Sequence, residues 1–229
     1  MLDLLAVLVV LPFALLVGAA IALAIAVDSP GPVIYRCRRI GRHGREFAML
    51  KFRKMREGAV GPLLTEPDDS RFTPIGRFLT VTRLDELPQL VNVLKGDMRL
   101  VGPRPEVEEF VSLYPREYAE ILSCPPGLTG LAQLEFFQES RIFGEAHASE
   151  DFYREGILPR KIELDLRYVR GRTLRGDVQI IAKTFGLPAR AAARAIQAGL
   201  ARHSRAQLAV YALAVACATA IITAFVVQA

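Results

Sequence analysis

Cysteine is scarce in this sequence, with three residues among 229, and they show no paired spacing. Cys37, Cys124 and Cys217 lie far apart, which argues against a disulfide framework and against a zinc site. An odd and scattered set of thiols fits a protein body that faces a reducing compartment. Internal repeats are also absent from the sequence, which argues against a repeat architecture.

Basic residues are absent ahead of the first hydrophobic run, Leu4 to Val27, which is bounded by Asp3 and Asp28. A cleaved signal peptide normally begins with such residues, so this interpretation is disfavoured. At about 1.5 Å per residue, the run is long enough to span about 30 Å of hydrocarbon. Pro12 should bend a helix here, which suits either a kinked span or a segment that re-enters the same leaflet. The residues alone leave both alternatives open.

Positive charge follows this run instead of preceding it. The net charge of +5 suggests anionic partners, and the mean hydropathy of +0.27 is high because apolar residues gather at the two termini. This distribution favours membrane lipids over nucleic acid as partners. Positive residues usually mark the cytoplasmic side of a membrane segment, and five arginines follow here: Arg36, Arg38, Arg39, Arg42 and Arg45. We therefore expect the body on the cytoplasmic face of the inner membrane.

A second apolar run lies near the other end of the sequence. Residues 206–229 are almost uncharged, and residues 189–205 before them are rich in arginine. The pattern predicts a C-terminal transmembrane helix that follows a basic helix lying on anionic headgroups. The alternatives are a buried helix of a soluble core and a solvated charged face.

Residues 29–188 between these runs are long enough for one domain, and their pattern is mixed. Two β-prone runs, 33–39 and 46–53, surround a Gly-Arg-His-Gly turn and predict a hairpin. Apolar periodicity in "FLTVTRLDELPQLVNVLKGDM", "PREYAEILS" and "RKIELDLRYVRG" predicts helices. The expected fold class is mixed α+β and mostly helical: a membrane-associated catalytic domain with a small hairpin.

Two adjacent carboxylates, Asp85 and Glu86, stand just ahead of Pro88, a residue suited to a first helical turn. A carboxylate at a helix N-terminus is stabilised in its charged form by the helix dipole and free N–H groups. Such an aspartate is a potential nucleophile, and a neighbouring glutamate can bind a hard cation through oxygen. The alternative is a helix cap in which Thr82 and Asp85 form a capping box.

Several blocks make the sequence resemble the bacterial sugar transferases, the monotopic polyprenol-phosphate phosphoglycosyl transferases. They are "SPGPVIYRCRRIGRHGREFAMLKFRKM", "LDELPQLVNVLKGDMRLVGPRP" and "PPGLTGLAQL", with the weaker "YVRGRTLRGDVQIIAKTF" behind them. The resemblance implies transfer of a phosphosugar from a UDP-sugar to undecaprenyl phosphate, with release of UMP. Asp85 would form the covalent aspartyl intermediate, and Glu86, with Asp85, would ligate Mg²⁺. It also implies a re-entrant N-terminal helix that breaks at a Ser-Pro pair, here Leu11-Pro12, so that the break depends on the proline alone.

The resemblance further implies substrate contacts from Arg77, Arg104, Pro105 and Gln133. Gln133 could equally be a polar group that is satisfied locally. The family's arginine after the "TGLAQ" block is missing, and Arg141 is the candidate to replace it. Two further departures lie before the aspartate, where Thr80 and Arg83 replace an arginine and a threonine or serine. Asp97 is expected to support local structure near Arg99, with a catalytic or metal role as its alternative.

Three functions compete at this point. The leading one is an enzyme that starts the assembly of a membrane glycan. The second is a catalytically lapsed scaffold that recruits other glycan-assembly enzymes. Two departures keep it open: the family's usual Arg-Pro-Gly is Pro125-Pro126-Gly127 here, and the arginine expected after the "TGLAQ" block is missing near Glu135. A nucleic-acid binder is disfavoured, because glutamates interrupt the basic face next to Arg104. Pairing of two protomers through the C-terminal helix is left open.

Overall fold

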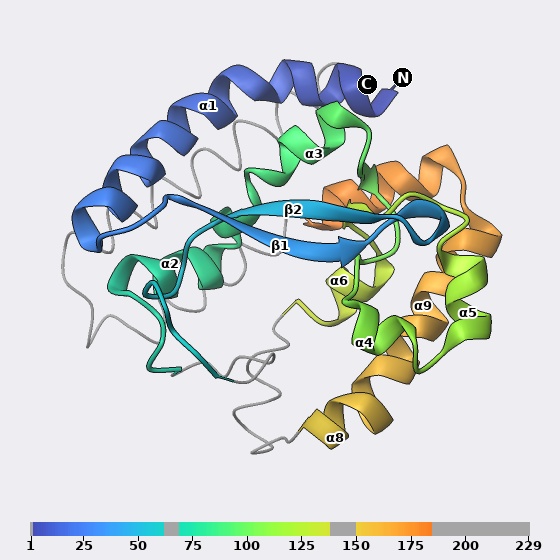
Figure 1. The fold of residues 1–229 in the computed structure, drawn as a ribbon. Coiled ribbons are helices and arrows are strands. Elements are labelled where there is room, and N and C mark those ends of the chain that lie inside the picture. Colours follow the sequence, from blue (N-terminus) through green and yellow to red (C-terminus); the bar gives the residue numbers. More distant parts are fainter. Residues whose placement is uncertain (1, 62–68, 138–149, 185–229) are drawn as a thin grey trace, which may run out of the picture.

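The computed structural model describes residues 2–61, 69–137 and 150–184. Within them the chain is mostly helical, with a small hairpin and an N-terminal apolar helix, as the sequence predicts, and with a second two-stranded sheet (Figure 1). The predicted basic helix 189–205 and transmembrane helix 206–229, and the candidate Arg141, lie outside the described residues. The first half contains α1 (Leu2–Asp28), β1 (Ile34–Ile40), η1 (Arg42–Gly44), β2 (Glu46–Phe52), α2 (Pro74–Thr82), η2 (Leu84–Glu86) and α3 (Gln89–Lys95).

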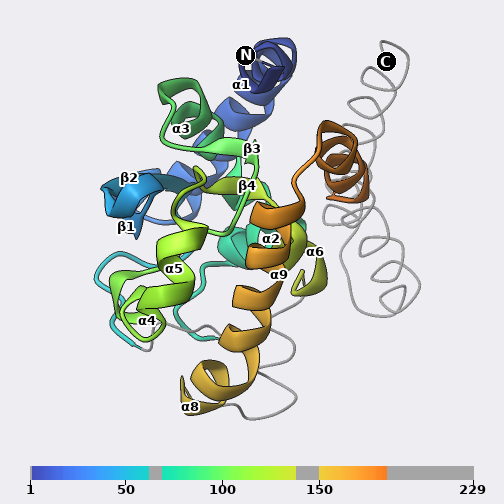
Figure 2. The ribbon, with the colours of Figure 1, turned by 90° about the vertical axis from the view of Figure 1, so that its right-hand side faces the viewer.

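The second half alternates short strands and helices. It contains β3 (Arg99–Val101), α4 (Glu108–Val111), α5 (Pro115–Ile121), β4 (Gly127–Thr129), α6 (Leu131–Glu135), α8 (Glu150–Phe152), the π-helical turn η3 (Tyr153–Ile157) and α9 (Leu158–Gly171), and 174–184 is helical too. Figures 1 and 2 show α1 at one edge of the molecule and α8 at the opposite edge, with the strands between them.

The predicted hairpin is confirmed: β1 and β2 pair antiparallel from Ile34↔Phe52 to Ile40↔Glu46. Asn92 on α3 extends the pairing, because its Oδ1 accepts from the Leu50 N–H at 3.0 Å and its Nδ2 donates to the Ala48 carbonyl at 2.8 Å. The same Nδ2 donates to Asp97 at 3.2 Å, so Asp97 supports local structure as expected. Arg99 pairs with Asp3 instead.

The core consists of apolar clusters that join the helices to the hairpin. Val7, Met49, Leu90, Val93 and Met98 join α1, β2 and α3, and a second cluster joins α1, β2 and α2. A third cluster packs α4 and α5 against η3 and α9. The hairpin is therefore fixed between the apolar helix and the rest of the body.

A parallel pair, β3 and β4, lies where the sequence predicts no strands. It fixes the turn Gly102–Pro105, because the Gly102 N–H donates to the Thr129 carbonyl at 2.9 Å and the Gly127 N–H donates to the Pro103 carbonyl at 2.8 Å. A Cβ on either glycine would collide with the backbone of the other strand. This close approach fixes where Arg104 leaves the turn.

Helix α1 runs unbroken through Pro12, so the expected break at this proline is wrong; Figure 1 shows a continuous, curved helix. Few of its side chains are buried, and its outward residues are large and apolar: Leu4, Leu5, Leu8, Val9, Phe13, Leu15, Leu16, Leu23 and Val27. Among the described residues it is the helix long and apolar enough to cross a membrane.

Both ends of α1 are attached to the body. At the start, Asp3 Oδ2 lies 2.9 Å from Arg99 Nη2. Just beyond the end, the buried guanidinium of Arg53 donates to the carbonyl of Ser29 at 2.6 Å and to that of Pro30. These contacts tie the segment that leaves α1 to the residue that follows β2.

A substitution in α2 can test how this helix packs against the residues that follow β2. Gly76 lies against the Lys54 carbonyl so closely that an added Cβ would overlap it. We expect Gly76→Ala to lower the free energy of unfolding by about 1–3 kcal/mol, as overpacked cores do, measured by chemical unfolding in detergent. The matched control is Gly171→Ala in α9, where no atom lies within 4 Å of the added Cβ. This control should be neutral or slightly stabilising, and equal behaviour of the two variants would contradict the packing.

Candidate active site

The acidic pair lies in η2, a single 3₁₀ turn between α2 and α3, so it stands just before a helix as predicted. The turn is entered through Arg83, whose backbone is left-handed at φ 60° and ψ 14°. That conformation costs a non-glycine residue about 1–2 kcal/mol, and such local strain gathers at functional sites. The capping-box alternative is wrong, because the Thr82 hydroxyl donates back to the Phe78 carbonyl at 2.9 Å.

Glu86 is nearly buried and is surrounded by three cations. Its Oε1 lies 3.1 Å from Lys51 Nζ, 3.6 Å from Arg83 Nη1 and 3.6 Å from Arg104 Nη2. Burial on its own would raise the pKa of Glu86, but Lys51, Arg104 and Arg83 together hold that pKa well below its ordinary value. Glu86 therefore stays charged and is tied to three separate segments of the chain.

Asp85 has a very different environment. It lines the same cavity but is only 2% exposed, and its Oδ2 lies 3.9 Å from Lys54 Nζ. Its Oδ1 is buried and accepts no hydrogen bond from the described residues. A carboxylate with few hydrogen bonds holds its lone pairs less tightly than one that is fully bonded, so Asp85 is the better nucleophile of the two.

Lys54 is itself mostly removed from water and lies 5.4 Å from the ring centre of Phe72. Desolvation lowers the pKa of Lys54, and the nearby Asp85 carboxylate acts in the opposite direction. Lys54 and Asp85 thus form a loose ion pair at the wall of the cavity.

The cavity has a volume of about 660 Å³ and a strongly basic wall. Among the described residues that line it, nine are lysine or arginine and four are aspartate or glutamate. Such an excess of positive charge suits an anionic ligand such as a diphosphate. Arg104 and Pro105, which the resemblance assigns to substrate contact, line this cavity, and Lys161, Tyr153 and Phe110 line it as well.

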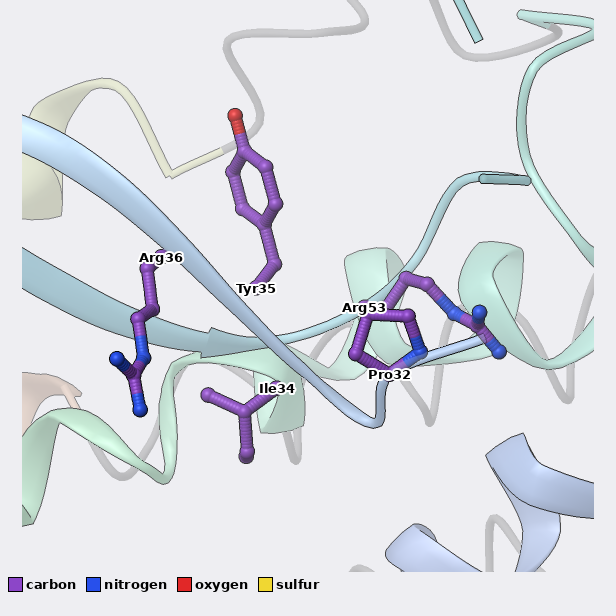
Figure 3. Close-up of a pocket in the computed structure, with 5 residues that line it drawn as sticks. All are labelled: Pro32, Ile34, Tyr35, Arg36 and Arg53. Carbon is purple, nitrogen blue, oxygen red and sulfur yellow. The ribbon is translucent and has the colours of Figure 1, made fainter. Parts of the chain in front are cut away.

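A shallower hollow of about 500 Å³ lies beside it, lined by Pro32, Ile34, Tyr35, Arg36 and Arg53 (Figure 3). Pro32, Tyr35 and Arg53 line both spaces, so the two adjoin each other. No carboxylate lines this hollow among the described residues, so the chemistry is assigned to the basic cavity.

Two other predicted residues lie elsewhere. Arg77 is exposed on α2 and is not among the residues that line the cavity. Gln133 on α6 does not line it either; its Nε2 donates to the Gly127 carbonyl at 3.4 Å, while its Oε1 is buried without a hydrogen-bond partner among the described residues. Its contact to Gly127 agrees with the local alternative given for it above.

Sequence reasoning missed Lys51 and Lys54 as site residues and treated Arg83 only as a departure. The available signal was the "KFRKM" block, in which basic residues continue a strand with an apolar face. Lys51 lies on β2 and Lys54 just beyond it, both far from Asp85 in sequence, so the packing of β2 against α3 and η2 brings them to the acidic pair.

The acidic pair offers carboxylate oxygens, the ligands that Mg²⁺ prefers. No cluster of three or more His, Cys, Asp and Glu residues occurs in the described part of the chain. Mg²⁺ often binds through one or two carboxylates together with oxygens of a substrate phosphate. The neighbouring carboxylates Asp85 and Glu86, with the unpartnered Oδ1 of Asp85, fit a site of this shared kind.

The sequence is similar to a known protein family. A family model described as bacterial sugar transferase matches residues 1–190. The chain is 38% identical over 168 residues to the UDP-glucose:undecaprenyl-phosphate glucose-1-phosphate transferase of Caulobacter vibrioides, covering 71% of this chain and 59% of that protein. It is 36% identical over 190 residues to the UDP-N-acetylgalactosamine-undecaprenyl-phosphate N-acetylgalactosaminephosphotransferase of Aeromonas hydrophila, covering 80% and 41%.

A shorter relative is covered more fully. The chain is 37% identical over 155 residues to an uncharacterized sugar transferase, EpsL, of Bacillus subtilis, covering 67% of this chain and 68% of that protein. By contrast, the chain matches only 41% to 59% of the length of the two relatives above.

The cations around Glu86 predict how stability depends on pH. Because the folded pKa of Glu86 is lowered, its contribution is fully present above the ordinary pKa of about 4.3 and is lost as pH falls through the lower folded value. At pH 7 we expect Glu86→Gln to lower the unfolding free energy by about 3 kcal/mol, since it removes the charged partner that three partly buried cations share.

The difference between wild type and Glu86→Gln should therefore shrink steadily as the pH is lowered below about 4, and it should be largest above about pH 5. Unfolding at a series of pH values in detergent measures it. Glu109→Gln on the exposed face of α4 is the control and should show little effect. A wild-type advantage that is constant down to low pH would contradict the assignment.

Proposed function

Since this chain belongs to the bacterial sugar transferase family, we propose that it moves a phosphosugar from a UDP-sugar to undecaprenyl phosphate and so starts the assembly of a membrane glycan. The observation that carries the proposal is the buried acidic pair at the wall of a basic cavity, beside an apolar helix. A UDP-sugar is an anion that such a cavity can bind, and an undecaprenyl chain needs a membrane-facing protein.

The proposed reaction has two steps. A carboxylate oxygen of Asp85 attacks the β-phosphorus of the UDP-sugar, the bond to the α-phosphate oxygen breaks, and UMP leaves with that electron pair. An oxygen of undecaprenyl phosphate then attacks the same phosphorus, and the Asp85 carboxylate is released. Asp85 suits the attack because it is less tightly bonded than Glu86, whose carboxylate already contacts three cations.

The residues around the pair have separate tasks in this proposal. Arg104 lies on a turn that β4 holds rigidly, and its planar guanidinium suits phosphate oxygens. Glu86, with Asp85, would hold Mg²⁺ together with the diphosphate. The ion would neutralise the charge that develops on the leaving phosphate. We expect a chelator to stop UMP release and added Mg²⁺ to restore it.

The attachment of α1 supports a membrane arrangement without crossing. The helix has 27 residues, so it extends about 40 Å at about 1.5 Å per residue. Its start contacts Arg99 and its end contacts Arg53, and both belong to the same body. A helix that crossed about 30 Å of hydrocarbon would place its two ends on opposite sides. We therefore propose that α1 enters and leaves through the cytoplasmic leaflet, with its exposed apolar face in lipid.

Asp85→Asn tests the covalent mechanism. With a panel of UDP-sugars and Mg²⁺ but no acceptor, the wild type should gain the mass of one phosphosugar on the peptide that contains Asp85, measured by intact and peptide mass spectrometry. The variant should gain none and should lose at least about 1,000-fold in turnover with undecaprenyl phosphate present, a size typical for loss of a nucleophile. Persistent turnover in the variant would remove the aspartyl intermediate, and no UMP with any donor would favour the scaffold alternative.

The path of α1 is tested by protease access. A cleavable tag placed before residue 1 should be cut in inverted vesicles, which expose the cytoplasmic face, and protected in intact spheroplasts. A tag inserted at Gly44, in the exposed hairpin turn, reports the side of the body and is the matched control. Opposite results for the two tags would show that α1 crosses the membrane.

A further inference from the structure

The backbone of Lys54 is fixed at the point where the hairpin meets α2. It lies two residues beyond β2, its carbonyl accepts from the Thr73 N–H at 3.0 Å, and Met55 next to it bridges to Phe72. Gly76 packs directly on the same carbonyl. The start of α2 therefore positions this residue rigidly with respect to the turn that carries Asp85.

The side chain of Lys54 extends from this fixed backbone to the cavity wall. Its Nζ lies 3.9 Å from Asp85 Oδ2 and beside the Phe72 ring, and the side chain is 26% exposed. Two other nearby cations, Lys51 and Arg83, are directed to Glu86 instead. The two carboxylates of the pair therefore have different cation partners, and Lys54 is a partner of the nucleophile.

We propose that Lys54 is a catalytic residue that follows the negative charge from the Asp85 carboxylate to the transferred phosphoryl group. This inference rests on the proposed function. During attack, Asp85 Oδ forms a bond to the β-phosphorus while the bond to UMP breaks, and UMP leaves with the electron pair. The resulting phosphodiester-like adduct keeps one negative charge, now on the non-bridging phosphoryl oxygens. Lys54 remains an ammonium throughout and transfers no proton.

The distance between Lys54 Nζ and Asp85 Oδ2 suits a cation that stabilises charge without occupying the attacking oxygen. At 3.9 Å the ammonium is near the carboxylate oxygen but beyond hydrogen-bond distance, so it does not occupy that oxygen as Lys51 occupies Glu86 Oε1 at 3.1 Å. In phosphoryl transfer, charge spreads over the equatorial oxygens, and a cation already in place next to them stabilises the transition state. A compact lysine ammonium can serve the carboxylate and the phosphoryl oxygens from one position.

The experiment separates formation of the adduct from binding of the donor. Purified full-length wild type, Lys54→Met and Lys54→Arg are mixed with a UDP-sugar that the wild type accepts, with Mg²⁺ and without acceptor, and the adduct and UMP are followed over time. We expect Lys54→Met to form the adduct at least about 100-fold more slowly, the size seen on loss of one charge-stabilising group, with KM for the donor changed less than about threefold. Lys54→Arg should recover to within about tenfold of wild type, since the charge is restored.

The matched control is Lys95→Met at the exposed end of α3, which should leave adduct formation unchanged. Thermal unfolding of each variant establishes that it is folded, and if Lys54→Met does not fold, Lys54→Gln replaces it in the same assay. A wild type that forms no adduct with any donor would overturn the proposed function itself. Adduct formation at the wild-type rate in folded Lys54→Met or Lys54→Gln, or a loss confined to KM, would overturn the role of Lys54 and leave the aspartyl mechanism intact.

Discussion

The rest of the site depends on the cluster of ion pairs around the Glu86 carboxylate. Lys51 comes from β2, Arg83 from the junction of α2 and η2, and Arg104 from the Gly102–Pro105 turn, and all three meet at this one side chain. Without a shared counter-ion, these cations would repel one another in a partly buried space. Glu86 therefore lets a basic cavity exist before any ligand enters, and it also joins three segments that are distant in sequence.

Buried acids in this protein serve different purposes because their surroundings differ. Glu86 is held charged by cations, whereas burial first, and the nearby Glu106 carboxylate second, raise the pKa of Asp165 on α9 well above its ordinary value. Asp165 accepts a hydrogen bond from the backbone of Arg104, while Glu86 lies near the guanidinium of the same residue. Asp165 therefore helps to position Arg104 for its contact with Glu86. Asp85 lies between these extremes, near one loosely placed lysine. The same functional group is thus a counter-ion, a support and a candidate nucleophile within one small region.

Much of this arrangement was predictable from sequence, and the failures have physical causes. The hairpin and helices α5 and α9 follow from local periodicity, and the acidic pair stands ahead of a helix as Pro88 suggests. The strands β3 and β4 have three residues each and, within the described part of the chain, pair with one another and with no other strand, so they leave no local pattern to detect. Arg77 was assigned to the site, but the helix turns Thr80 and not Arg77 toward the cavity. Arg83 could not be placed without knowing its left-handed backbone.

The two contacts that attach α1 to the body close loops of very different length. Arg53 follows Ser29 by 24 residues, whereas Arg99 follows Asp3 by 96. During synthesis the end of the apolar helix can be captured by the hairpin early, while its start has no ionic partner until β3 has been made. Closing the longer loop costs more chain entropy and comes later. Formation of the contact between Asp3 and Arg99 therefore requires closure of a much longer loop than formation of the contact between Ser29 and Arg53.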